Sequence, residues 1–269
     1  KEQEKNMLPK NPASISIAEN NRPNYRNFLY PIEQSQSTII ALHQSDDETP
    51  YYVAINPNGQ HEKICHPGPQ KSQLFNAVSN RYIAWINREV NPLYSNILYS
   101  NIVLYDLTSD SIIAKSKHSF FDSVTISADE DKVAALEQNP YGVSTLSILS
   151  LPTLTPIKKI PLSDGVYSFI HFINNTDILA IRTKDEEKSV VTINTQNMTK
   201  EILYSTYENI GTPRLANSIL FLSLSYKGND RILAVDLKQK KRYIFAESSY
   251  GTYYPSISKD QQYVYFNMA

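Results

Sequence analysis

The sequence predicts an all-β protein, a β-propeller of about six four-stranded blades. Two observations support this fold class: a short apolar, strand-like block recurs along the chain, and a polar turn precedes each copy. The six blocks are 39–42, 83–85, 133–136, 178–181, 219–222 and 264–266, and their first residues lie 41 to 50 residues apart. That spacing is close to the roughly 40–45 residues of a propeller blade. No long stretch with helical periodicity interrupts the series.

The sequence around each block predicts the other strands of its blade. A run of β-branched and aromatic residues, typical of a half-buried strand, follows each of the first five blocks, at 51–55, 102–107, 145–149, 190–193 and 232–237. A turn and a shorter, more polar strand then close most units, for example at 61–65, 111–114 and 242–246. The innermost strands are expected at 25–30, 73–78, 120–126, 166–172, 210–215 and 253–257. The result is five whole units and the first half of a sixth.

The two ends define the expected domain boundaries. The last blade is incomplete in this chain or is closed by an N-terminal strand at 13–18, where apolar and polar residues alternate. We therefore expect a tail or linker with this candidate closing strand over 1–22, and a propeller domain over 23–269.

Composition narrows the choice of partners. With 41% hydrophobic residues the chain can build a packed core, and a formal net charge of -1 provides no basic field for nucleic acid. No apolar run reaches the roughly 20 residues needed to cross a bilayer, so we expect no membrane insertion by this segment. The lone Cys65 excludes an internal disulfide and leaves the compartment open.

Motifs for catalysis, metals and cofactors are missing or incomplete. The segment 61–66 reads His-Glu-Lys-Ile-Cys-His, but zinc-binding H-E-x-x-H needs the two histidines four residues apart on a helix, and here they are five apart. The nucleophile elbow G-x-S-x-G is absent. The acidic runs 46–48 and 184–188 are expected at solvated hairpin tips. We predict no catalytic residue, no metal site and no cofactor.

Tyrosine is the residue whose abundance suggests recognition, because its ring offers contact area with a polar tip. The loop expected at 87–101 is the first choice for a binding site, since extra loop length on a rigid scaffold is where binding usually lies. The candidate binding residues are Arg88, Tyr94, Tyr99, Tyr226, Tyr250 and Tyr253.

Two segments resemble the repeat of TolB-like and tricorn-like β-propellers (the PD40 type, related to WD40-like repeats). That repeat reads Pro-x-hydrophobic-Ser-x-Asp-Gly-Lys followed by alternating apolar residues. Residues 255–266 are the best match and 124–135 the second, and both lack the usual glycine. Asp129 and Asp260 are expected to cap the turn between two inner strands, which makes the motif a folding device.

Further short features, among them Tyr-Ser-Asn-Ile at 99–102 and Ser-Tyr-Gly at 249–251, are similar to those of large cell-envelope proteins from Bacteroidetes-type bacteria. In that group a propeller follows a metallopeptidase-like N-terminal region. The resemblance implies export, a periplasmic or cell-envelope location, and flanking domains of a larger parent protein as partners. It assigns no catalytic residue to this segment.

The first functional hypothesis is a non-catalytic propeller that binds a protein, a peptide or a glycan. One alternative is an accessory domain that gates or orients substrate for a peptidase domain in the same parent protein. The other is a hydrolase or lyase centred on the propeller channel, using His118, Asp122 and His171.

Overall fold

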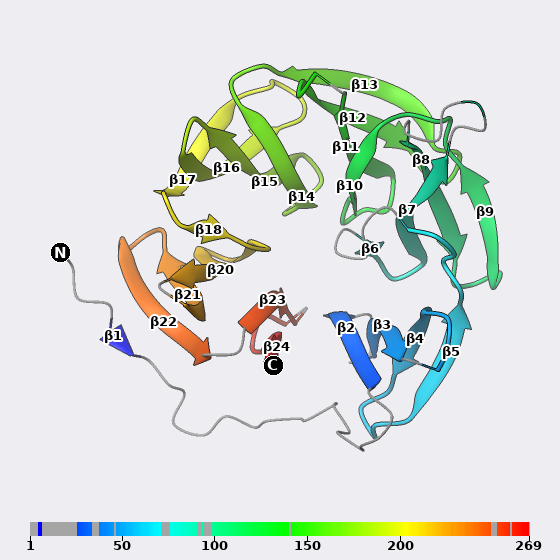
Figure 1. The fold of residues 1–269 in the computed structure, drawn as a ribbon, viewed down its shortest axis with the longest axis horizontal. Helices are drawn as coiled ribbons and strands as arrows, with labels where there is room; N and C mark the ends of the chain where they lie inside the picture. Colours follow the sequence, from blue (N-terminus) through cyan, green and yellow to red (C-terminus); the bar gives the residue numbers. More distant parts are fainter. Residues whose placement is uncertain are drawn as a thin grey trace. The chain divides into compact units, whose positions relative to one another are not determined.

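The computed structural model describes residues 5–6, 26–33, 38–45, 47–70, 76–90, 93, 98–139, 141–226, 228–248, 252–258 and 260–268. The chain divides into two compact units. The central unit is Pro67–Tyr207, and the terminal unit combines Lys1–His66 with Glu208–Ala269. Every element among the described residues is a β-strand, as Figure 1 shows.

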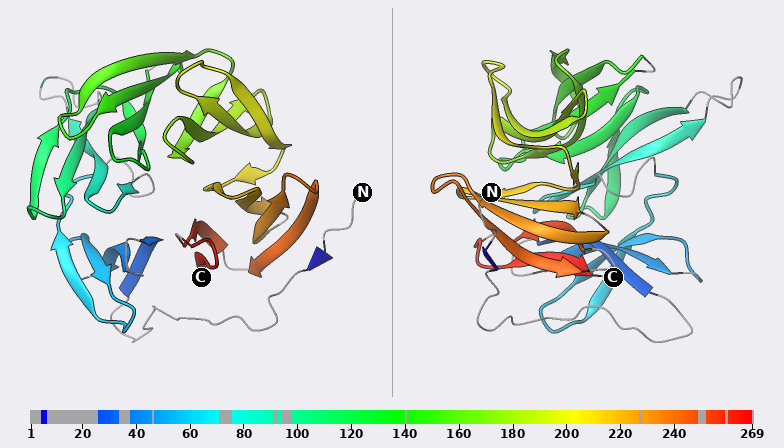
Figure 2. Two further views of the ribbon diagram at one scale, coloured as in Figure 1. Left: turned by 180° about the vertical axis from the view of Figure 1, so that it is seen from behind. Right: turned by 60° about the vertical axis from the view of Figure 1, so that its left-hand side comes forward.

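The central unit consists of three four-stranded antiparallel sheets, each formed by consecutive strands. The first contains β6 (Ala77–Val78), β7 (Tyr82–Val90), β8 (Leu98–Asp106) and β9 (Ser111–Lys115). The second contains β10 (Phe121–Ile126), β11 (Lys132–Gln138), β12 (Ser144–Ser150) and β13 (Thr155–Leu162). The third contains β14 (Val166–Phe172), β15 (Asp177–Lys184), β16 (Glu187–Asn194) and β17 (Lys200–Thr206). Figure 2 shows the strong twist of these sheets.

The terminal unit holds three more sheets. One is four-stranded, with β2 (Arg26–Glu33), β3 (Ile39–Ser45), β4 (Tyr51–Ile55) and β5 (His61–Cys65). The second contains β20 (Ile219–Tyr226), β21 (Asn229–Asp236) and β22 (Lys241–Ser248), with the short β18 (Asn209–Ile210) and β19 (Arg214–Ala216) both paired to β20. The third has two strands, β23 (Thr252–Ile257) and β24 (Val264–Met268).

These sheets confirm the all-β class and the predicted blade, but they correct the blade count. Five sheets have the strand complement of a blade, not about six, because β23 and β24 form a two-stranded sheet within the described residues. The candidate closing strand at 13–18 lies outside the described residues. Within the expected tail, β1 (Lys5–Asn6) pairs in parallel with β22.

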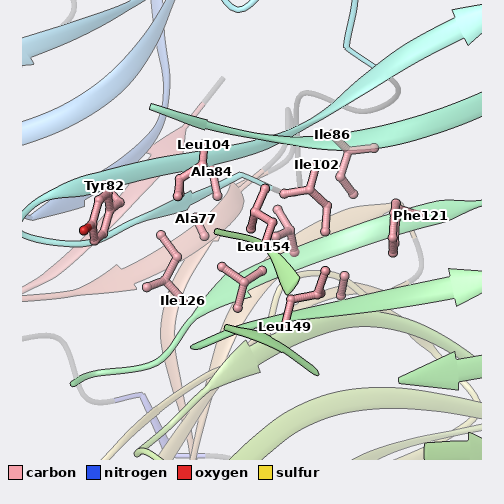
Figure 3. Packing of buried hydrophobic residues seen from close by; sticks show 13 residues of the cluster. Ala77, Tyr82, Ala84, Ile86, Ile102, Leu104, Phe121, Ile126, Leu149 and Leu154 are labelled. Carbon is pink, nitrogen blue, oxygen red and sulfur yellow. The ribbon is translucent and has the colours of Figure 1, made fainter. Parts of the chain in front are cut away.

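The inner strands are apolar on both faces, which explains why the recurring blocks do not alternate. In β11, Val133 and Ala135 pack toward the β6–β9 sheet, while Ala134 and Leu136 pack toward the β14–β17 sheet, and all four are fully buried. Figure 3 shows the first of these interfaces, where Ile86 and Leu104 face Ile126 and Leu149. A central sheet therefore completes two cores at once.

Side-chain hydroxyls cap the inner edge of β14. The N–H groups of Ile170 and Phe172 donate to Ser123 Oγ (3.1 Å) and Thr125 Oγ1 (3.0 Å), which lie on β10 of the preceding sheet. The N–H of Tyr167 donates to Ser144 Oγ on β12 at 3.1 Å. A buried N–H without a partner costs about 1–3 kcal/mol, so these hydroxyls fix the spacing of adjacent sheets as well as protecting the edge.

The turn between inner strands confirms the predicted role of the Ser-x-Asp motif. Ser127 Oγ donates to Asp129 Oδ1 (2.6 Å) and accepts from Lys132 N (3.0 Å). Ser258 and Asp260 repeat this arrangement at 2.6 Å. The position at which the family has glycine is Glu130 in one turn and Gln261 in the other, and both have left-handed φ angles, 58° and 59°.

We predict that Gln261→Gly stabilises the protein. A left-handed conformation costs a non-glycine residue about 1–2 kcal/mol, and the added freedom of glycine in the unfolded chain offsets about 0.4–1 kcal/mol of the gain. The net increase in the free energy of unfolding should be roughly 0.5–1 kcal/mol, measured by urea denaturation. The neighbouring Gln262→Gly, outside the left-handed set, should destabilise; equal effects of the two changes would contradict this explanation.

Candidate functional site

The connections at one end of the central unit form the best candidate site. Strands alternate in direction, so the β7–β8, β9–β10 and β11–β12 connections lie at the same end of their sheets. Backbone hydrogen bonds join them: Ser100 and Ser119 exchange two N–H···O bonds of 2.8 Å, and Gln138 N donates to Phe120 O at 3.0 Å. Main-chain hydrogen bonds thus hold the β9–β10 connection against β8 and the end of β11.

The first part of this surface is the Glu89 cluster, defined as Glu89, Tyr99, Asn101, His118 and Phe120. Glu89 on β7 accepts from Asn101 Nδ2 on β8 at 2.8 Å and pairs with His118 Nδ1 at 3.0 Å. The Tyr99 ring lies edge-on to His118 and 5.5 Å from the ring of Phe120. His118 and Glu89 are partly exposed, whereas Asn101 is 4% exposed. The cluster therefore presents a polar, charged group beside an aromatic surface.

The second part is a half-buried carboxylate, Glu137 on β11. Burial alone would raise its pKa, but hydrogen bonds from Ser147, Ser119 and Lys159 outweigh burial, so the pKa of Glu137 is lowered. Ser119 Oγ donates at 2.7 Å and Lys159 Nζ lies 3.0 Å away. Because its oxygens are already engaged by three donors, Glu137 is suited to holding the β9–β10 connection in place rather than to accepting a substrate proton.

Exposed apolar side chains lie at the same end of these sheets. Tyr141 and Val143 in the β11–β12 connection are 91% and 49% exposed. Val90 at the end of β7 and Leu93 in the β7–β8 connection are 52% and 84% exposed. Phe120 links the two connections through its contacts with Tyr99 and Gln138. Large apolar side chains gathered at connections on a rigid scaffold are typical of a binding surface.

A third cluster lies where the β13–β14 connection meets the β14–β17 sheet. Asp164 accepts from Tyr167 Oη at 3.0 Å, pairs with Lys200, and lies 3.4 Å from Arg182 Nη1. Gly165 allows the β13–β14 connection to pass close to β15, because a Cβ at residue 165 would lie 2.8 Å from the Thr183 carbonyl oxygen. Burial opposes ionisation, but the Lys200 ammonium and the Tyr167 hydroxyl lower the pKa of Asp164 to about 2.

Among the predicted binding residues, Arg88 and Tyr99 belong to this end of the central unit. Arg88 is exposed on β7, and Tyr99 is half-buried on β8. Tyr226 and Tyr253 lie on β20 and β23 of the terminal unit, and Tyr94 and Tyr250 fall outside the described residues.

The predicted loop at 87–101 needs a correction. Residues 87–90 and 98–101 are paired strand, with Val90 opposite Leu98, so the loop is confined to the residues between them. Polar residues continue both strands beyond the buried part of the sheet, where one face contacts solvent. A polar composition therefore suggests a loop where the chain is paired strand.

The other sequence expectations can be placed as well. His61–Cys65 forms the outer strand β5, as expected, and not a zinc-binding helix. The run at 184–188 forms the β15–β16 turn with Asp185 in a left-handed conformation. Asp122 and His171 are half-buried on the innermost strands β10 and β14, whereas His118 lies in the β9–β10 connection. Among the described residues no group of three or more His, Cys, Asp and Glu is arranged to hold a metal ion.

Sequence reasoning missed Glu89, Asn101, Phe120 and Glu137. None of them stands in a recognisable motif, and they meet only through pairing of β7 with β8 and through the β9–β10 connection. The sequence offers one weak signal for this cluster, which is the presence of charged and amide residues at the ends of otherwise apolar strands.

Comparison with solved structures decides the fold. TolB from Acinetobacter baumannii superposes with a TM-score of 0.65 at 10% identity, covering 82% of this chain and 57% of TolB. The fold is a TolB-like β-propeller. The β-propeller domain of the trilobed protease from Pyrococcus furiosus gives 0.54 at 10% identity, with 87% and 90% coverage. An oligogalacturonate lyase from Vibrio parahaemolyticus gives 0.58 at 9% identity, with 90% and 86% coverage.

No family model matches the sequence, and no curated protein matches it. The TolB-like propeller spans just over half of the TolB chain that it matches. At these identities the likeness concerns the fold alone, and the similar structures include TolB, a protease domain and a lyase. No helix in the described part of the chain has the length and apolar character to cross a membrane.

We predict that Asp164→Asn weakens the propeller at neutral pH and has little effect near pH 2. The folded-state pKa of Asp164, about 2, lies below its ordinary value of 3.8. The carboxylate therefore contributes stability above pH 4 that is lost as the pH falls toward 2. Asp164 is 40% exposed, so solvent screening reduces the expected loss to about 1 kcal/mol.

The measurement is urea denaturation of both proteins at pH 7 and pH 2.5. The exposed Glu186→Gln in the β15–β16 turn is the control and should be close to neutral at both values. A stability difference between Asp164→Asn and the parent that persists unchanged at pH 2.5 would rule out the electrostatic explanation.

Proposed function

We propose that this chain is a non-catalytic binding propeller that recognises polypeptide at the β7–β8, β9–β10 and β11–β12 connections. The observation that carries the proposal is the exposed apolar group of Val90, Leu93, Tyr141 and Val143 beside the Glu89 cluster. Burying such side chains against a partner contributes about 25 cal/mol per Å² of apolar surface. The partly exposed Glu89 and His118 supply directional polar contacts at the rim.

Two features favour polypeptide over a glycan or a small molecule. The exposed side chains are aliphatic as well as aromatic, and aliphatic side chains offer little to a sugar ring, which prefers aromatic faces. The residues also spread over two connections, as suits an extended partner. Arg88, exposed at the same end on β7, adds a fixed positive charge.

The cellular setting is part of the proposal. The motif resemblance and the TolB-like fold support an exported protein of a bacterial cell envelope, in which the propeller is one domain of a longer parent protein. Its partners would then include the flanking domains. As an alternative, we propose that one flanking domain is a peptidase and that the same surface orients its substrate; the similar protease propeller supports this alternative.

The test is binding of the purified chain to arrays of 12-residue peptides and of oligosaccharides. We expect saturable binding to a subset of peptides, weakened at least tenfold by Tyr141→Ser combined with Val143→Ser. These side chains are exposed, so the double variant should keep the melting temperature of the parent protein.

The matched control is Ile157→Ser, which removes an apolar side chain of similar exposure, 57%, from the outer strand β13. It should leave peptide binding unchanged. Binding to oligosaccharides alone, or peptide binding that the double variant leaves intact, would refute recognition of polypeptide at this surface.

A further inference from the structure

The outer edge of β22 carries an additional strand. β22 is the outermost strand of its antiparallel sheet, and β1 pairs with its free side in parallel register, Lys5 opposite Tyr243 and Asn6 opposite Ile244. Figure 1 shows β1 beside β22, and both belong to the terminal unit. In the described residues the outer strands β5, β9, β13 and β17 end their sheets without such a partner.

The sequence of β22 explains why this edge accepts a strand. Natural outer strands discourage pairing by being short or by containing proline. β5 and β9 have five residues each, and β13 contains Pro156 and Pro161. β17 has seven residues and no proline, and β22, with eight residues and no proline, is the longest proline-free outer strand among those described. Its edge N–H and C=O groups are therefore available over a longer stretch.

The side chains of β22 add a second preference. Tyr243 to Ala246 are half-buried, and Tyr243, Phe245 and Ala246 pack against the core of the terminal unit. The charges lie near the ends of the strand, with Lys241 and Arg242 exposed at its start. In a parallel pair both strands start at the same end, so a partner with acidic residues ahead of its pairing residues is favoured. The chain's own sequence before Lys5 is Lys-Glu-Gln-Glu.

We propose that the outer edge of β22 is a docking site for an extended polypeptide segment in parallel register, and that Lys5–Asn6 is its tethered occupant. The partner it fits is a short segment with acidic residues before the paired ones, as in residues 1–12 of this chain. Main-chain hydrogen bonds provide the affinity, as in other cases of strand addition to a sheet edge. The tether gives the resident strand a millimolar effective concentration, so it competes with any free segment.

The experiment uses a fluorescent peptide with the sequence of residues 1–12 and three forms of the full chain: the parent, Lys5→Pro/Asn6→Pro, and Lys5→Ala/Asn6→Ala. Adjacent N–H groups of a strand point to opposite sides, so proline at both positions removes the one that faces β22, whereas alanine keeps it. Fluorescence anisotropy should show the proline variant binding the peptide at least tenfold more tightly than the parent or the alanine variant. The substitutions lie outside the blades, so the fold is not at risk.

A second peptide with proline at positions 5 and 6 is the matched ligand control, and it should lose at least tenfold in affinity for the proline variant. Equal affinity of the three proteins for the first peptide, or no binding by the proline variant, would overturn the proposal. So would equal binding of the two peptides. None of these outcomes bears on the surface around Tyr141, because that surface belongs to the other unit.

Discussion

Burial of the inner strands on both faces is the constraint on which the central unit depends. A strand such as β11 is apolar on both sides, so its sheet cannot exclude water without a neighbour on each side. Polar groups follow the same logic, because Ser123, Thr125 and Ser144 satisfy N–H groups of the next sheet. Apolar contact supplies the energy, and these hydrogen bonds set the spacing and register of adjacent sheets.

This arrangement leaves the connections free to vary. At one end of the sheet, Ser127 and Asp129 hold the β10–β11 turn, and the charge of Asp129 has a structural role. The opposite end of the central unit has the Glu89 cluster and the exposed Tyr141. Glu137 anchors the β9–β10 connection from beneath, so the aromatic and polar groups above it are held in position. A binding surface built in this way loses little conformational entropy when a partner docks.

The edges of the sheets present a different physical problem. Hydroxyls of the preceding sheet cap the inner edge of β14, and the outer strands β5, β9 and β13 are limited by their length or by proline. β22 is longer, contains no proline and pairs with a sixth strand of its sheet, β1. The same backbone chemistry that stabilises a blade therefore offers a site for another chain segment, and the sequence of each outer strand decides whether it is used.

The sequence by itself determined the blade, because apolar blocks with regular spacing and Ser-x-Asp turns are local patterns; β14 lies at Val166–Phe172 and β5 at His61–Cys65, as predicted. Arg88 and Tyr99, which the sequence predicts as binding residues, lie on β7 and β8. Only the tertiary structure brought Glu89 to His118, Glu137 to Ser119 and Asp164 to Lys200. These partners lie on different strands and connections, and sheet pairing, which sequence spacing does not encode, sets their distances.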